Sequence, residues 1–353
     1  GGEKGDYTLI SPNSHVNMAQ STNDAFPTAV RIAALKLVKK LLKELKALQE
    51  ALLAKAEEFD DIVKMGRTHL QDAVPIRLGQ EFGAYARAIG RDIDRIQASS
   101  KALNEVNMGA TAVGTGLNAK VEYIESTIEN IRKITGLPIR GAENMVDATQ
   151  NMDTIAAFSA TLKVLAISLS KMANDLRLMA SGPRTGINEI NLPAVQPGSS
   201  IMPGKVNPVM AEVVNQVAFQ VIGNDHTVAL AVEAGQLELN VMEPVVVFNF
   251  MQSIEILTNV IKVFREKCIV GITANRDRCQ SMVDKSVGII TALLPYIGYE
   301  EATKLAKEVA STGKTVPEII AEKNIFTSEE MEKVLSPKAM TEPGIALEEK
   351  VKK

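Results

Sequence analysis

The sequence of 353 residues is poor in several residue types, and each shortage excludes a class of protein. It has no tryptophan, three histidines and two cysteines, Cys268 and Cys279. Two cysteines cannot build a disulfide framework, and neither stands at a metal-ligand spacing, so the sequence predicts a reducing compartment and no metal site. No secretory signal opens the chain, and we expect a cytoplasmic protein without a cofactor.

Charge and hydropathy exclude two further classes of partner. The formal net charge is −3, and no basic stripe interleaved with aromatic residues appears, so we expect no binding to nucleic acid. The most apolar run, residues 245–257, is interrupted by Asn249, Gln252, Ser253 and Glu255. It is too short and too polar to span a bilayer and predicts a buried helix instead. The composition therefore favours a small-molecule ligand.

Long helical periods dominate what remains, in a chain that is 46% hydrophobic. Apolar residues step by three or four along one face of residues 30–52, 78–96, 154–179, 218–230 and 245–264. Several long helices of this kind predict an all-α bundle. Because these helices carry more apolar surface than one chain covers, we also expect the protein to be oligomeric.

The segment from Gly198 to Asn207, GSSIMPGKVN, has a composition that no helix or strand favours. Its glycines open backbone angles closed to other residues, so several N–H groups can point inward as an anion-binding nest. A helix is predicted to start after Pro208, and its N-terminus would also favour an anion. The segment therefore predicts a functional loop that binds a carboxylate or phosphate.

Three other segments gather polar residues between helices: residues 15–24 (HVNMAQSTND), 64–80 (KMGRTHLQDAVPIRLGQ) and 107–118 (NMGATAVGTGLN). In the first, one residue of Ser21 to Asp24 is expected to cap a helix, with Pro27 in its first turn. The second contains His69 beside Thr68, a pair able to donate to a carboxylate. The third is interpreted as a tight-packing or substrate-side loop, because no apolar strand precedes its glycines and the third glycine of the dinucleotide-binding fingerprint is missing.

These segments together resemble the fumarase/aspartase superfamily of lyases. GSSIMPGKVNP looks like its signature loop, and QSTND, GRTHLQDA and ATAVGTGLN resemble three further superfamily motifs. The resemblance implies a homotetramer whose long helices form one twenty-helix core, with each active site drawn from three subunits. It also implies a remnant of an N-terminal domain at 1–24, a central helical bundle at 25–295 and a small helical C-terminal domain at 296–353.

The resemblance also assigns roles to residues of this chain. It implies Ser199 as the catalytic base, although residue chemistry alone does not separate Ser199 from Ser200, with His69 and Lys205 as further catalytic residues. Glu212 would orient His69. The expected substrate-binding residues, which offer hydroxyl, amide or backbone N–H donors, are Ser21, Thr22, Asn23, Thr68, Ser200, Ile201, Met202 and Asn207.

Within the superfamily, the motifs at 17–24, 64–75, 207–221 and 238–245 look like those of aspartate ammonia-lyases. Fumarases typically differ at each place, for example with FRP instead of Met242-Glu243-Pro244. The resemblance thus implies reversible deamination of L-aspartate to fumarate and ammonia, through proton abstraction from Cβ and an aci-carboxylate intermediate. The alternatives are a fumarate hydratase or an inactive structural relative, like some lens crystallins, or an inactive truncated fragment.

One departure concerns the N-terminus. Superfamily members begin with roughly a hundred further residues that carry another substrate loop, and this chain starts after them. We expect that domain to be truncated or supplied separately.

Overall fold

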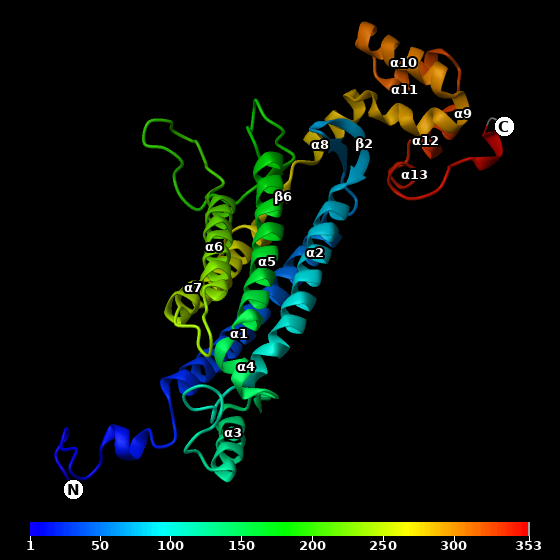
Figure 1. Ribbon diagram of the computed structural model, residues 1–353. Helices are drawn as coiled ribbons and strands as arrows, with labels where there is room; N and C mark the ends of the chain where they lie inside the picture. The colour runs from blue at the N-terminus through cyan, green and yellow to red at the C-terminus, as the bar shows by residue number, and fades with distance from the viewer. Residues whose placement is uncertain (352–353) are drawn as a thin grey trace. The chain divides into compact units, whose positions relative to one another are not determined.

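The computed structural model describes residues 1–351, which are mainly helical as expected (Figure 1). The α-helices are α1 (Thr22–Glu58), α2 (Leu78–Ser100), α3 (Val121–Thr135), α4 (Met145–Gln150), α5 (Asp153–Met179), α6 (Val209–Glu233), α7 (Glu243–Lys267), α8 (Arg276–Lys285), α9 (Leu294–Ile297), α10 (Tyr299–Thr312), α11 (Val316–Glu322), α12 (Ser328–Val334) and α13 (Pro337–Thr341). The strands are β1 (Val63–Thr68), β2 (Gln71–Arg77), β3 (Glu105–Val106), β4 (Arg140–Gly141), β5 (Ile190–Asn191) and β6 (Thr273–Ala274). They form three sheets of two strands each, so the all-α prediction is confirmed.

The longest helix, α1, contains 37 residues and buries the face that its periodicity predicts. Leu41, Leu45, Leu48 and Leu52 on that face are completely buried. Because the helical period brings residues three or four apart onto one side, the lysines and glutamates between them remain at the surface. Helices α2, α5, α6 and α7 likewise cover the other four predicted helical segments.

The chain divides into two compact units. Unit 1 contains Gly1–Leu48, Ile89–Ala173 and Glu212–Phe264, and unit 2 contains Gln49–Ala88, Asn174–Ala211 and Arg265–Lys353. Each boundary between them falls inside a long helix. The boundaries of these two units differ from the domain boundaries that we expected after residues 24 and 295. The expected division into three domains stays a prediction.

In unit 1, helices α5, α6 and α7 pack side by side (Figure 1). Phe158 of α5 meets Phe250 of α7 edge to face, with ring centroids 5.7 Å apart. Polar pairs also cross between the helices: the Ser159 hydroxyl donates to Asp225 of α6 at 2.8 Å, and the Asn224 amide donates to Ser253 of α7 at 3.0 Å. The polar residues that interrupt the apolar runs thus have partners inside the bundle.

Unit 2 joins the β1–β2 hairpin to α8 and to the short C-terminal helices. Its main core cluster includes Met65, Leu293, Ile319 and Ile320, all of which are buried. The shorter helices expected after about residue 296 are present, and α11 and α12 both start with a capping box, formed by Thr315 with Glu318 and by Thr327 with Glu330.

One carboxyl group of unit 1 predicts a pH dependence of stability. Burial raises the pKa of Glu243, the first residue of α7, to about 7, against the opposing effect of Arg31. The group therefore favours folding when protonated, and this contribution is lost as the pH rises through 7. A rise in pKa from 4.5 to about 7 corresponds to about 3.5 kcal/mol, at about 1.4 kcal/mol for each unit of pKa. We halve this energy because the side chain is partly exposed, so ionised Glu243 lowers the free energy of unfolding by about 1–2 kcal/mol above pH 7.

We therefore expect Glu243→Gln to raise the free energy of unfolding by about 1–2 kcal/mol at pH 8, with the gain disappearing toward pH 4. Urea unfolding followed by circular dichroism at several pH values measures this difference. The exposed Glu238→Gln serves as the control and should change little at any pH. A gain that does not depend on pH, or that grows as the pH falls, would contradict the assignment.

Candidate active site

The glycine-rich segment 198–207 lies in unit 2 and forms a loop closed at its base. The Gly198 N–H donates to the Lys205 carbonyl at 2.8 Å, and the Asn207 side-chain amide donates to the Gly198 carbonyl at 3.0 Å. A Cβ at position 198 would stand 2.4 Å from the Lys205 oxygen, so this close approach requires glycine. These two contacts hold the ends of the loop together, and residues 199–204 lie between them. Helix α6 begins shortly after the loop, at Val209, as predicted.

Ser199 differs from Ser200 in its surroundings. The Ser199 side chain is half-buried, and its Oγ accepts the backbone N–H groups of Ile201 and Met202, each at 3.3 Å. Ser200 is exposed. Two N–H donors aimed at one hydroxyl oxygen stabilise negative charge on it, which favours loss of its proton. The local geometry thus distinguishes the two serines, which residue chemistry alone did not.

Thr68 and His69 stand at the tip of an antiparallel hairpin that the sequence analysis did not foresee. Strands β1 and β2 pair with Thr68 opposite Gln71, so His69 and Leu70 form the two-residue turn between them. Both turn residues have positive φ, 53° and 58°, the geometry of a type I′ turn that usually takes Asn-Gly. The usual turn residues are absent and Pro75 interrupts β2, so no clear signal of a hairpin is present in the sequence. The tip is exposed to solvent.

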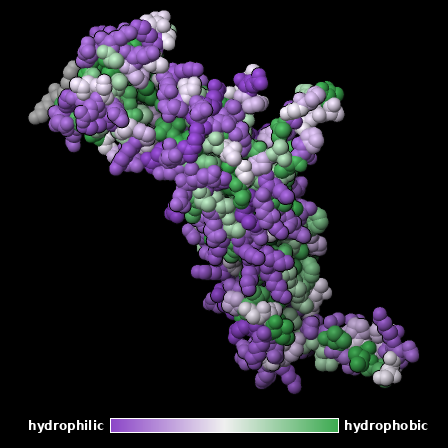
Figure 2. Space-filling model, turned by 180° about the vertical axis from the view of Figure 1, so that it is seen from behind, coloured by the Kyte–Doolittle hydropathy of each residue, from purple (hydrophilic) through white to green (hydrophobic). Residues whose placement is uncertain are grey.

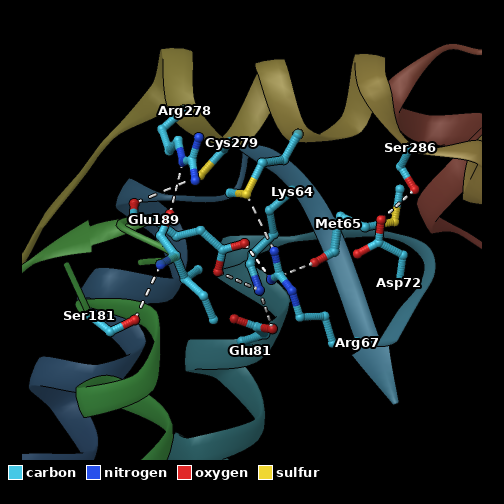
Figure 3. Close-up of polar contacts among 12 residues, drawn as sticks. Lys64, Met65, Arg67, Asp72, Glu81, Ser181, Glu189, Arg278, Cys279 and Ser286 are labelled. Atoms are coloured by element: carbon cyan, nitrogen blue, oxygen red, sulfur yellow. Dashed lines mark hydrogen bonds and ion pairs between the residues drawn. The ribbon is translucent and has the colours of Figure 1, made fainter. Parts of the chain in front are cut away.

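Two charged side chains of β1 meet two carboxylates from outside the hairpin, and we call Lys64, Arg67, Glu81 and Glu189 the Glu189 cluster (Figure 3). Glu189 is completely buried. Its Oε1 accepts from Arg67 at 2.6 Å and its Oε2 stands 3.0 Å from Lys64 Nζ. Lys64 also pairs with Glu81 of α2 at 2.8 Å. The cluster therefore joins β1 to α2 and to the segment that precedes β5.

Burial changes the acidity of one group of the Glu189 cluster and of both cysteines. It raises the pKa of Glu81, and the pairing with Lys64 only partly opposes this. Burial also raises the pKa of the Cys279 thiol to about 11 and that of Cys268 to about 12. Both thiols are therefore neutral near pH 7, and neither is an active nucleophile. In residues 1–351, no group of three or more His, Cys, Asp or Glu side chains could hold a metal ion.

Ser21, Thr22 and Asn23 belong to unit 1, at the start of α1. The Ser21 hydroxyl accepts the Asn23 N–H at 3.2 Å, and the Asp24 carboxylate accepts the Ser21 N–H at 3.0 Å. This reciprocal pair is a capping arrangement, so the predicted cap is confirmed and belongs to Ser21. The helix begins at Thr22, however, which puts Pro27 in the second turn rather than in the first as expected.

The position of Pro27 explains a contact that crosses to the loop 107–118. Proline has no N–H, so the Asn23 carbonyl four residues earlier lacks its helical partner. The Asn107 side-chain amide donates to that carbonyl at 3.0 Å, and the Asn23 amide donates in turn to the Ala112 carbonyl at 2.7 Å. A Cβ at Gly114 would stand 2.3 Å from Val146, so this loop packs tightly, as expected.

Asp24 is completely buried, and beyond its place among the cap candidates it has a role that was not expected from the sequence. Its Oδ2 accepts the N–H groups of Gly109 and Thr111 at 3.2 and 2.9 Å, in addition to the Ser21 contact at Oδ1. One carboxylate thus joins the start of α1 to the loop 107–118. The signal in the sequence that could have identified Asp24 is its place directly after Ser21, Thr22 and Asn23. No comparable signal in the sequence identified Glu189.

The predicted site residues consequently fall into separate groups. Unit 1 holds Ser21, Thr22, Asn23 and Glu212, and unit 2 holds the hairpin tip and the loop 198–207. Within the described part of unit 2, no hydrogen bond or ion pair joins the tip to that loop. The roles of these residues in catalysis stay predictions.

Comparison with known proteins gives consistent matches along the chain. A protein family described as Lyase matches residues 2–223, and one described as Fumarase C C-terminus matches residues 289–342. An aspartate ammonia-lyase from Bacillus subtilis is 59% identical over the entire chain, which covers 74% of that protein.

Solved structures agree with this result. A fumarate lyase:delta crystallin from Brucella melitensis has a TM-score of 0.92 and 46% identity, over 96% of this chain and 74% of its own. A class II fumarase from Schistosoma mansoni has a TM-score of 0.88 and 36% identity, over 94% of this chain and 73% of its own.

The contacts of Asp24 predict a large effect of a small substitution. Asp24→Asn replaces one carboxylate oxygen by an N–H donor and leaves at least one buried backbone N–H without an acceptor. We expect the free energy of unfolding to fall by about 2–3 kcal/mol in urea unfolding. The exposed Asp277→Asn is the control, with an expected change within about 0.5 kcal/mol. Equal effects of the two substitutions would show that the three N–H contacts of Asp24 contribute little.

Proposed function

The chain belongs to the fumarase/aspartase superfamily of lyases, and we propose that it is an aspartate ammonia-lyase, which converts L-aspartate reversibly into fumarate and ammonia. The observation that carries this proposal is the difference between two matches. Identity reaches 59% over all of the chain with an aspartate ammonia-lyase, but 36% with a class II fumarase. The motifs at 17–24, 64–75 and 238–245 support the same choice.

The reaction requires removal of a weakly acidic proton from the carbon next to the β-carboxylate. The electron pair of that C–H bond moves into the carboxylate, which becomes a doubly charged aci-carboxylate. When the pair returns to form the carbon–carbon double bond, the C–N bond breaks and ammonia leaves. Because the charge on the carboxylate doubles, the largest catalytic contribution is expected from donors fixed around it.

Ser199 is the proposed base. A serine hydroxyl is a very weak base in water, so the site must favour its deprotonated form. The N–H groups of Ile201 and Met202 support this role, since both are directed at Ser199 Oγ. Lys205, in the same loop, adds a positive charge. Deprotonated Ser199 would accept the proton from Cβ and later release it to solvent.

The remaining donors belong to the other segments. Thr68 and His69 are exposed at the hairpin tip, where they can reach a substrate carboxylate, and Glu212 is the proposed orienting residue for His69. Ser21, Thr22 and Asn23 are proposed to bind substrate as well. Ser200, Ile201, Met202 and Asn207 complete the set, although the amide of Asn207 and two of these N–H groups also brace the loop itself.

We also propose a cytoplasmic homotetramer whose active sites take residues from three subunits. Large apolar side chains are exposed on the helices of unit 1, and Figure 2 shows hydrophobic surface along the long helices. They are Val164 and Ile167 of α5, Val213, Phe219, Ile222 and Leu230 of α6, and Val245, Phe248 and Val263 of α7. A monomeric protein rarely exposes this much apolar surface, which supports burial between subunits.

By length and composition alone, residues 153–179 and 243–271 could also cross a membrane. This differs from the expectation that the run 245–257 is too short and too polar to do so, because the helix extends beyond that run. Both helices nevertheless carry polar side chains bonded to a neighbouring helix, such as Ser159 with Asp225 and Ser253 with Asn224. These contacts are typical of core helices in a bundle. They support packing within a helix bundle rather than contact with lipid.

The oligomer proposal is tested by placing charge on the exposed apolar face. Phe219 and Phe248 are each 65% exposed in the single chain, and Phe219→Glu/Phe248→Glu should prevent subunits from burying them. Light scattering should give about four times the chain mass of 38.1 kDa for the native protein and a smaller species for the variant. Tyr299→Glu, at a residue 79% exposed in unit 2, should keep the native mass. A double variant of native mass would contradict the proposal.

The activity is tested by the absorbance of fumarate when the protein is offered L-aspartate or, separately, L-malate. We expect fumarate from aspartate, and a fall in kcat of about 10²–10⁴-fold in Ser199→Ala because the base is lost. Ser311→Ala, on the exposed surface of α10, is the matched control and should keep the native rate. Fumarate from malate alone would make the protein a fumarate hydratase, and none from either substrate, in a folded tetramer, would favour a structural relative.

A further inference from the structure

The Glu189 cluster is costly for the protein to maintain. Four charged side chains leave water, among them Glu189 with 0% exposure and Lys64 with 3%. The desolvation of such groups offsets much of their mutual attraction, and well-packed apolar residues of similar volume often stabilise a fold equally well. A contribution to stability alone therefore does not explain why these four positions carry charged side chains.

The ion pair between Arg67 and Glu189 fixes two pieces of backbone. Glu189 is held by its own main chain, because its N–H donates to the Met179 carbonyl at 2.9 Å and its carbonyl accepts the Asn275 N–H at 2.8 Å. Its carboxylate is thus a stationary acceptor. Arg67 donates to it at 2.6 Å and also to the Met65 carbonyl at 3.3 Å. These contacts fix the position of Arg67 in β1, and therefore the point from which the chain continues into Thr68.

The turn beyond Arg67 needs such support. His69 and Leu70 both adopt positive φ, which costs residues other than glycine energy at each position. Strained backbone of this kind persists only where the surrounding structure enforces it. The tip is exposed, and the Arg67–Glu189 pair is the buried anchor nearest to it along β1.

We propose that Arg67 and Glu189 are positioning residues, which hold Thr68 and His69 in the geometry that the elimination requires. This inference rests on the proposed function, in which the hairpin tip binds the substrate carboxylate. Donors to a developing charge must stand within a fraction of an ångström of their productive positions. A displaced tip would therefore slow the reaction even in a well-folded protein.

The test replaces the pair by apolar residues of similar size, Arg67→Met/Glu189→Leu, and leaves Lys64 paired with Glu81. We expect the melting temperature to stay within a few degrees of the native value, while kcat for L-aspartate falls about 100-fold and KM rises less than tenfold. Arg77→Met/Glu342→Leu removes the ion pairs of Arg77 with Glu342 and Asp60 at the opposite end of the hairpin and is the control, with kcat within twofold. If the apolar variant does not fold, Arg67→Lys, which keeps the charge but loses the planar fork, is expected to show a smaller loss in kcat.

A second comparison separates positioning from a structural role. If the pair acts through Thr68 and His69, the same double substitution made in Thr68→Ala/His69→Ala should cost less than threefold, because both groups that it positions are already gone. Native kcat in the apolar variant, or an equal 100-fold loss with and without Thr68 and His69, would overturn the proposal.

A third measurement does not depend on turnover. A nitroxide attached to Leu70→Cys, a position 67% exposed, reports the mobility of the tip, since the two native cysteines are buried. We expect the spectrum to narrow in the apolar variant and not in the control. An unchanged spectrum would overturn the positioning role, whereas a native protein that makes no fumarate would overturn the proposed function.

Discussion

One buried carboxylate, that of Glu189 between Lys64 and Arg67, holds together much of unit 2. Through these two cations it connects β1 with α2, and through its own backbone it connects the end of α5 with the segment before α8. Both proposed catalytic elements of this unit extend from that anchor. The hairpin tip follows Arg67 directly, and the loop that starts at Gly198 follows the β5 segment.

In both units a buried carboxylate lies next to residues that are proposed to bind the substrate. In unit 1 the buried Asp24 directly follows Ser21, Thr22 and Asn23, and it ties them to the loop 107–118. In unit 2 the buried Glu189 holds Arg67, which precedes Thr68 and His69. The physical reason is the same in each case. A hydrogen-bond donor at the surface has a well-defined position only when the backbone that carries it is rigid. A buried carboxylate that accepts several hydrogen bonds restricts that backbone effectively.

The helices were predictable from sequence because burial of one face imposes a period that short-range inspection detects, as Leu41, Leu45, Leu48 and Leu52 of α1 illustrate. The signature loop was equally visible from its glycines and proline. The hairpin at 63–77 was missed, since His69 and Leu70 adopt a turn that their residue types do not signal. The contact between Arg67 and Glu189 spans 122 positions of sequence, which no local pattern reveals. Likewise, the preference for Ser199 over Ser200 depends on where two N–H groups point.

The central claim is that the Glu189 cluster makes the backbone around it rigid, while the proposed catalytic segments that follow remain exposed. Amide hydrogen exchange of the complete native protein tests this claim most directly. The account predicts slow exchange at residues 63–67 and 189–191, close to that of the core helices, together with fast exchange at 68–70 and 199–206. Exchange at 63–67 and 189–191 as fast as at the hairpin tip would contradict it, because the Glu189 cluster would then not constrain the segments that it joins.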